Sequence, residues 1–107
     1  MRLVADIVGT NTRLALHNPE LDELVGARRY KNEDFDAFED VVLDYLPQSS
    51  GRPREIVVAM AGPVKGNAGR LTNVDWTISG DALRQRFSVD NVRVINDLTR
   101  WVLRRSG

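Results

Sequence analysis

Short apolar runs separated by polar breaks predict three strands at the start of the chain. Residues 3–7 form a first apolar run, a turn at residues 9–11 interrupts it, and residues 13–16 resume it. Glycine and asparagine tolerate positive φ, so this break favours a β-hairpin. Residues 17–19 end the second strand, and residues 23–30 form a weaker third strand with Gly26 as a β-bulge.

Further along, the apolar spacing changes to three, four and seven residues. This spacing predicts an amphipathic helix over residues 34–46, and the apolar run at residues 55–61 is typical of a strand buried on both faces. Residues 62–69 and 72–76 are expected to be irregular. Ser79 should cap a helix that ends at Phe87, followed by a strand at residues 91–95 and a helix from Leu98.

This order of elements predicts an α/β fold. A β-hairpin meander followed by alternating helices and strands implies a mixed sheet with helices on its faces. Asp6 and Asp97 would then both lie at the carboxyl ends of strands, where open α/β sheets place their ligands.

Composition narrows the class of protein. The 107 residues suffice for one domain with a hydrophobic core, and 15 basic residues balance 15 acidic ones. No overall field therefore draws the chain to nucleic acid or to a membrane. The absence of cysteine, of a membrane-length apolar run and of a signal peptide makes a cytoplasmic protein the default expectation.

The first turn is the first candidate for chemistry. Backbone N–H groups around Gly9, Thr10 and Asn11 suit a phosphate, and the carboxylate of Asp6 suits the magnesium that accompanies nucleotide phosphates. The alternative interpretation is a plain hairpin turn with an incidental aspartate.

Three separated segments agree with one family. DIVGTNTRLAL at residues 6–16, AGPVKGNAGRLTNVDW at residues 61–76 and VIND at residues 94–97 resemble, in order and spacing, the amino-terminal domain of bacterial glucokinases. Those enzymes belong to the actin-like superfamily of sugar kinases and ATPases, whose domains are ribonuclease H-like. The resemblance covers nearly all of residues 1–107 and implies the small domain of a two-domain kinase.

The resemblance implies a role for each motif. It implies that Asp6 binds magnesium, that Asp97 is the catalytic base for transfer from ATP to the 6-hydroxyl of glucose, and that Asn96 binds the sugar. The residues near the γ-phosphate would be Gly9, Thr10 and Asn11, and the wall of the sugar cleft would be shaped by Gly62, Pro63, Thr72 and Asn73.

Each role also has a structural alternative. Asp97 and Asn96 could cap the helix that follows, and the loop residues Thr72 and Asn73 could bond only their own backbone. Gly62 and Pro63 could form a simple turn. Trp76 is expected to be a packing anchor rather than a sugar platform.

Three departures from the family pattern bear on activity. Val8 replaces the first of two glycines, which predicts about 1–3 kcal/mol of strain or a blocked phosphate unless its backbone is ordinary β. Arg100, Arg104 and Arg105 suggest altered packing of the last helix. Finally, the family's large domain does not follow within residues 1–107, so we expect little activity from this chain alone.

Three functions therefore remain open at this point. The first is a glucokinase domain that binds glucose or a related hexose with ATP and magnesium. The second is a non-catalytic module acting through sugar or partner binding, including a homodimer through the face that would meet the large domain. The third is a ribonuclease H-like nuclease with metals at Asp6 and Asp97, which the neutral charge disfavours.

Overall fold

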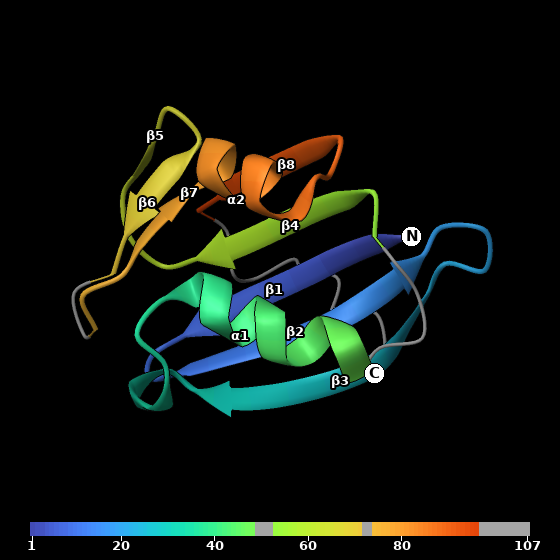
Figure 1. Cartoon of the computed structure of the whole chain (residues 1–107), viewed down its shortest axis with the longest axis horizontal. Helices are drawn as coiled ribbons and strands as arrows, with labels where there is room; N and C mark the ends of the chain where they lie inside the picture. The colour runs from blue at the N-terminus through green and yellow to red at the C-terminus, as the bar shows by residue number, and fades with distance from the viewer. Residues whose placement is uncertain (49–52, 72–73, 97–107) are drawn as a thin grey trace.

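A five-stranded mixed sheet forms the centre of the chain. The computed structural model describes residues 1–48, 53–71 and 74–96. Figure 1 shows the sheet as a twisted layer whose strands run in the order β3-β2-β1-β4-β8. These strands are β1 (Arg2–Val8), β2 (Asn11–Asn18), β3 (Glu23–Lys31), β4 (Glu55–Met60) and β8 (Asn91–Ile95).

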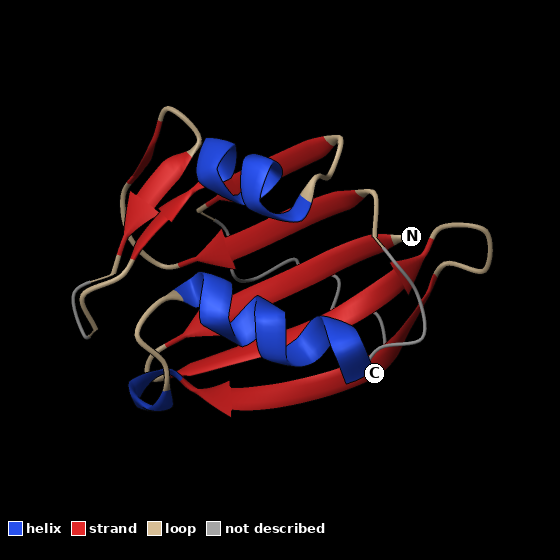
Figure 2. Ribbon diagram, viewed as in Figure 1, coloured by secondary structure: helices blue, strands red, loops and turns tan. Residues whose placement is uncertain are grey.

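Two kinds of connection build this sheet. β1, β2 and β3 are antiparallel neighbours joined by hairpins, whereas β4 pairs in parallel with β1, and β8 in parallel with β4. The parallel strands are reached through α1 (Phe38–Tyr45) and α2 (Gly80–Phe87). Both helices cover the same face of the sheet (Figures 1 and 2). The predicted meander and the alternation of helices and strands as far as β8 are confirmed, whereas the helix predicted from Leu98 lies outside the described residues.

The helix-covered face holds the main core. Alternate residues of each strand point toward the helices, because successive side chains of a strand lie on opposite faces. The main core includes Leu3, Ala5 and Ile7 of β1, with Phe38, Val41, Val42, Tyr45 and Leu83 from the helices. A separate small cluster of Val4, Ala15 and Ala59 lies on the other face. Among the described residues, no helix is both long and apolar enough to cross a bilayer.

The first helix begins later than its apolar spacing predicts. α1 starts at Phe38 rather than at residue 34, after a 3-10 turn at Asn32–Asp34. Phe35 and Ala37 are extended, with φ of −132° and −150°. The extended Phe35 carbonyl accepts a hydrogen bond from Trp76 Nε1 at 3.3 Å. This hydrogen bond joins segments 41 residues apart and takes the place of a helical turn at Phe35. The spacing of apolar residues carries no information about such a contact.

The prediction that residues 62–69 are irregular is wrong. This segment contributes β5 (Val64–Lys65) and β6 (Ala68–Arg70), which form a second sheet with β7 (Thr77–Ser79). Gly66 and Asn67 both have φ of +60°, as a two-residue type I′ hairpin turn requires. The Asn67 amide then bonds the edge of β8, donating to Val92 O at 2.8 Å and accepting from Val94 N at 2.7 Å. One side chain thus continues the hydrogen bonding of the main sheet.

Gly26 forms the predicted β-bulge in β3. Leu16 pairs with Val25 and Leu14 pairs with Arg28, so two residues of β3 oppose Ala15 alone. Gly26 has φ of +65°, and its carbonyl accepts a hydrogen bond from Tyr45 Oη at 2.8 Å. The bulge is therefore fixed from α1, and it shifts every later residue of β3 by one position.

We expect Gly26→Ala to cost about 2 kcal/mol of unfolding free energy, because it combines left-handed strain with crowding. A Cβ at Gly26 would lie 3.2 Å from Tyr45 Oη. Gly66→Ala is the matched control: its φ is +60° but a Cβ there meets nothing within 4 Å, so strain alone of about 1 kcal/mol is expected. Urea unfolding of both variants measures the difference, and equal losses would refute the role given to Tyr45.

Candidate functional site

The carboxyl ends of the three parallel strands β1, β4 and β8 lie side by side at one end of the sheet. Asp6 of β1 is in register with Ala59 of β4, and Ala59 with Ile95 of β8. Asn96 follows Ile95 directly and is exposed. Strands lie about 4.8 Å apart, so the backbone at Asp6 and Ile95 is separated by about 10 Å. Asp6 and Asn96 therefore lie near the carboxyl ends of their strands, whereas Asp97, for which this position was predicted together with Asp6, lies outside the described residues.

Asp6 is a buried carboxylate with one oxygen in use. Its side chain is only 3% exposed, and Oδ2 accepts a hydrogen bond from Arg13 Nη2 at 2.8 Å. Oδ1 is buried and has no hydrogen-bond partner. Burial raises the pKa of Asp6, because it disfavours the charged form, while Arg13 acts in the opposite direction. An unpaired buried oxygen of this kind costs stability and is suited to a cation.

Asn32 holds the turn beside Asp6 in place by bonding its carbonyl groups. Gly9 has φ of +59° at the first position of a two-residue loop that Val8 and Asn11 close. Asn32 N donates to Thr10 O at 2.9 Å, and Asn32 Nδ2 lies 3.5 Å from Gly9 O. These bonds draw both turn carbonyls toward the protein.

The buried amide of Asn32 is itself fixed by β2. Thr12 Oγ1 donates a hydrogen bond to Asn32 Oδ1 at 2.6 Å, and both residues are fully buried. The position of the predicted phosphate turn therefore depends on a residue that sequence analysis did not single out.

Val8 is not strained. It is the last residue of β1, it pairs with Asn11, and it is not among the described residues with positive φ. Extended backbone suits a β-branched side chain, so the expected strain is absent. Its side chain is 43% exposed and lines a hollow of about 140 Å³ together with Asn11, Arg13 and Arg29, which we call the turn hollow.

The predicted sugar-side residues are only partly described. Gly62 follows β4 with φ of +135°, a conformation that L side chains rarely adopt, and Pro63 is exposed beside it. Thr72, Asn73 and Asp97 lie outside the described residues.

A backbone hydrogen bond joins Leu71 to Trp76. Leu71 N donates to Trp76 O at 3.0 Å. Trp76 is 2% exposed, and its ring meets Phe38 edge to face at 6.3 Å. The prediction that Trp76 is a packing anchor is confirmed.

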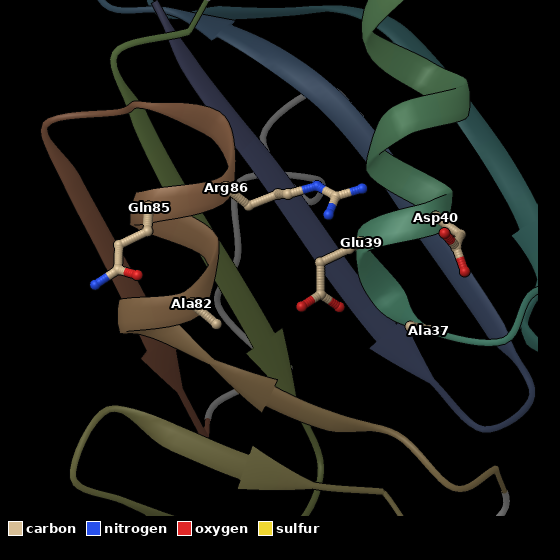
Figure 3. A pocket seen from close by; sticks show the side chains of 6 residues that line it. All are labelled: Ala37, Glu39, Asp40, Ala82, Gln85 and Arg86. Carbon is tan, nitrogen blue, oxygen red and sulfur yellow. The ribbon is translucent and has the colours of Figure 1, made fainter.

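A larger hollow lies on the opposite face, between the two helices. It measures about 530 Å³ and is lined by residues of α1 and α2 and their flanks (Figure 3). The side chains of Glu39 and Arg86 extend into the space between the helices. Asp6 alternates with the helix-facing residues of β1, so this hollow lies on the other side of the sheet from it. It is not part of the candidate site.

Asp6 is the one predicted metal ligand among the described residues. No group of three or more His, Cys, Asp or Glu side chains gathers there. Magnesium in phosphate-binding sites takes one or two carboxylates, with phosphate oxygens and water completing its shell. The free Oδ1 of Asp6 beside the turn fits that requirement, whereas it does not fit a metal held by protein ligands alone.

Comparison with known proteins decides the family. The sequence model of the family described as Glucokinase matches residues 3–103. The chain belongs to the glucokinase family. Among family members, the glucokinases of Yersinia pestis (strain Pestoides F) and Yersinia pseudotuberculosis (serotype O:1b, strain IP 31758) are each 35% identical over 97 residues. Those matches cover 91% of this chain and 30% of each relative.

Solved structures agree with the glucokinase family. The crystal structure of glucokinase from an Antarctic psychrotroph has a TM-score of 0.77 and 33% identity, covering 90% of this chain and 32% of that one. A putative sugar kinase from Cytophaga hutchinsonii has a TM-score of 0.69 at 20% identity, over 90% of this chain and 36% of its own, and shows the fold alone. The predicted actin-like fold is confirmed. This chain spans about a third of these relatives.

The pairing of Arg13 with Asp6 was not predicted from the sequence, although a signal was present. If a two-residue loop at Gly9 and Thr10 is closed by Val8 and Asn11, counting two residues outward pairs Asp6 with Arg13. Asn32 gave no comparable signal, because its contact with the turn depends on the path of the chain after β3.

We expect Asn32→Ala to lower the unfolding free energy by about 2 kcal/mol, since it removes the bonds beneath the turn and leaves buried groups unsatisfied. Asn18→Ala is the control: Asn18 Oδ1 also accepts a backbone bond, from Glu20 N at 3.0 Å, but at an exposed position, so about 0.5 kcal/mol or less is expected. Urea unfolding measures both variants. Equal losses would show that Asn32 does not support the turn.

The raised pKa of Asp6 predicts a pH-dependent difference between the wild type and Asp6→Asn. Below the unfolded-state pKa, Asp6 is protonated in both states and contributes no pH dependence. As the pH rises through the folded-state pKa, the wild type must ionise a buried group and loses stability relative to Asp6→Asn. Urea unfolding of both proteins between acidic and neutral pH measures this difference. A difference that stays constant with pH, or reverses sign, would contradict the assignment.

Proposed function

We propose that this chain is the amino-terminal, small domain of a glucokinase-type enzyme, which transfers the γ-phosphoryl group of ATP to the 6-hydroxyl of glucose. The observation that carries the proposal is the buried Asp6, whose Oδ1 lacks a partner beside the Gly9–Thr10 turn. Membership of the glucokinase family supports the same reaction. Structural ion pairs in sheets do not require an unpaired buried oxygen.

The nucleotide side of the reaction depends on Asp6 and the turn. Asp6 Oδ1 would hold magnesium, and Gly9, Thr10 and Asn11 would lie against the phosphates. When bound, magnesium neutralises charge on the phosphate oxygens, which favours phosphoryl transfer. Arg13 keeps Asp6 in place through Oδ2, so that the second oxygen remains available. Asn32 holds the turn carbonyls away from the ligand, because it bonds them from within the protein.

The sugar side depends on residues that follow β4 and β8. Asp97 would take the proton from the 6-hydroxyl as it attacks, and Asn96 would bond a sugar hydroxyl. Gly62, Pro63, Thr72 and Asn73 would shape the wall of the cleft. Phosphoryl transfer requires mainly positioning and charge stabilisation, so one carboxylate base together with a metal is a sufficient set of groups.

In the proposed enzyme, this chain forms one wall of the substrate cleft and a second domain forms the other. Sugar kinases of this kind close two domains around their substrates, and closure excludes water from the reacting groups. The chain spans about a third of its curated relatives, so binding rather than turnover is the appropriate measurement.

Calorimetric titration of the chain with glucose at millimolar concentration tests the proposal. We expect weak, saturable binding that Asp97→Ala reduces at least tenfold, because a hydrogen bond to a charged group is lost. Asp90→Ala is the control, since Asp90 is an exposed carboxylate at the opposite end of β8.

Two outcomes would count against the proposal. Equal glucose binding by wild type and Asp97→Ala would remove the role assigned to Asp97. Absence of heat with both glucose and magnesium–ATP, from a folded sample, would instead favour the non-catalytic alternative.

A further inference from the structure

We propose that Arg29 is a ligand-binding residue that extends the phosphate site from the Gly9–Thr10 turn onto β3, so that the site takes a chain of linked phosphates rather than a single phosphate. This inference rests on the proposed function, and it adds a residue to which neither the family motifs nor the predicted site assign a role. The geometry, the charges and the turn hollow each support it.

Strand register places Arg29 next to the site. Arg29 is opposite Arg13 on β3 and β2, and Arg13 is opposite Asp6 on β1. Residues directly opposite one another point to the same face of a sheet. Asp6, Arg13 and Arg29 therefore form one row across three strands, which lie about 4.8 Å apart. The row runs from the candidate metal ligand toward the edge of the sheet.

The bulge at Gly26 selects Arg29 rather than Arg28. Arg28 is opposite Leu14, a core residue beneath the helices, so Arg28 points to the helix-covered face. Its charge lowers the pKa of Tyr45 on α1, in keeping with that position, although burial raises the same pKa more strongly. Without the extra residue in β3, Arg28 would be opposite Arg13 instead.

The row of Asp6, Arg13 and Arg29 carries an excess of positive charge, which favours binding of an anion. One carboxylate, Asp6, stands against two guanidinium groups, and Arg13 is already paired with it. Among the described residues, Arg29 has no ion-pair partner. Lys31 is opposite Asn11 two pairs further toward the turn, and therefore on the same face as Arg29. Like charges directly opposite one another destabilise a sheet, so this arrangement is unfavourable until an anion lies between them.

The turn hollow provides the space for that anion. Val8, Asn11, Arg13 and Arg29 line it, with a volume of about 140 Å³, and Val8 and Asn11 are the residues that flank the turn. Arginine binds phosphate through several parallel N–H donors, and two arginines on neighbouring strands suit an extended polyanion. A ligand that contacts both a magnesium ion at Asp6 and the side chain of Arg29 spans two strand spacings, about 10 Å, which favours linked phosphates over a single one.

Titration of the 107-residue chain with tripolyphosphate in the presence of magnesium tests the inference, with orthophosphate as the comparison ligand. We expect the wild type to prefer tripolyphosphate, and Arg29→Gln to lose about tenfold in affinity for it. Arg28→Gln is the matched control, because it removes the same charge from the adjacent residue on the opposite face; its affinity should stay within twofold of the wild type. Arg29→Lys, which keeps the charge but loses the planar fork, should be intermediate.

A second readout uses the ligand-free protein. Arg29→Gln should raise the midpoint of thermal unfolding, because it relieves repulsion from Arg13, and added salt should narrow the difference. A lower midpoint would show that Arg29 stabilises the sheet without a ligand.

Three binding results would overturn the inference: no tripolyphosphate binding by the wild type, unchanged binding by Arg29→Gln, or equal losses in Arg28→Gln and Arg29→Gln. The glucose titration separates this failure from that of the proposed function. If glucose binding and its dependence on Asp97 persist while any of these results holds, the glucokinase proposal stands and the role of Arg29 falls.

Discussion

A carboxylate buried in the central strand of the sheet sets the requirements for the rest of the structure. β1 is bonded to β2 on one side and to β4 on the other, so Asp6 cannot turn away from its row. Burying its charge is unfavourable unless a partner stands beside it. Arg13 supplies one partner, and the second oxygen remains without one. Such a local violation of good core design is characteristic of positions kept for function.

The sheet separates structure from chemistry by using its two faces differently. Both helices pack on one face, where aromatic and aliphatic side chains form the main core. The candidate site residues on β1 and β2 point to the other face, near the carboxyl ends of the parallel strands. Packing changes beneath the helices can therefore occur without moving Asp6, provided that the strand register is kept.

Much of this arrangement could be predicted from the sequence, and the failures have physical causes. Apolar runs located the five main strands, and the order of elements placed Asp6 at a strand end. The short strands β5 and β6 were missed because their stability comes from the Asn67 amide bonding β8, a contact between residues more than 20 positions apart. Arg29 was missed because its face depends on a one-residue shift inside β3. Hydrophobic periodicity reports which face is buried, but not which polar neighbours share a row.

The bulge at Gly26 also bears on how β3 keeps its alignment with β2. Two adjacent arginines, Arg28 and Arg29, lie after it, so sliding β3 by one residue would put one guanidinium in place of the other opposite Arg13. The charge directly opposite Arg13 therefore cannot discriminate between the two alignments. Tyr30 can, because it packs on the main core and against Phe35 at 5.6 Å, and sliding would transfer its ring to the opposite face. The ring of Tyr30 on the helix-covered face thereby determines that Arg29, rather than Arg28, is available to a ligand on the opposite face.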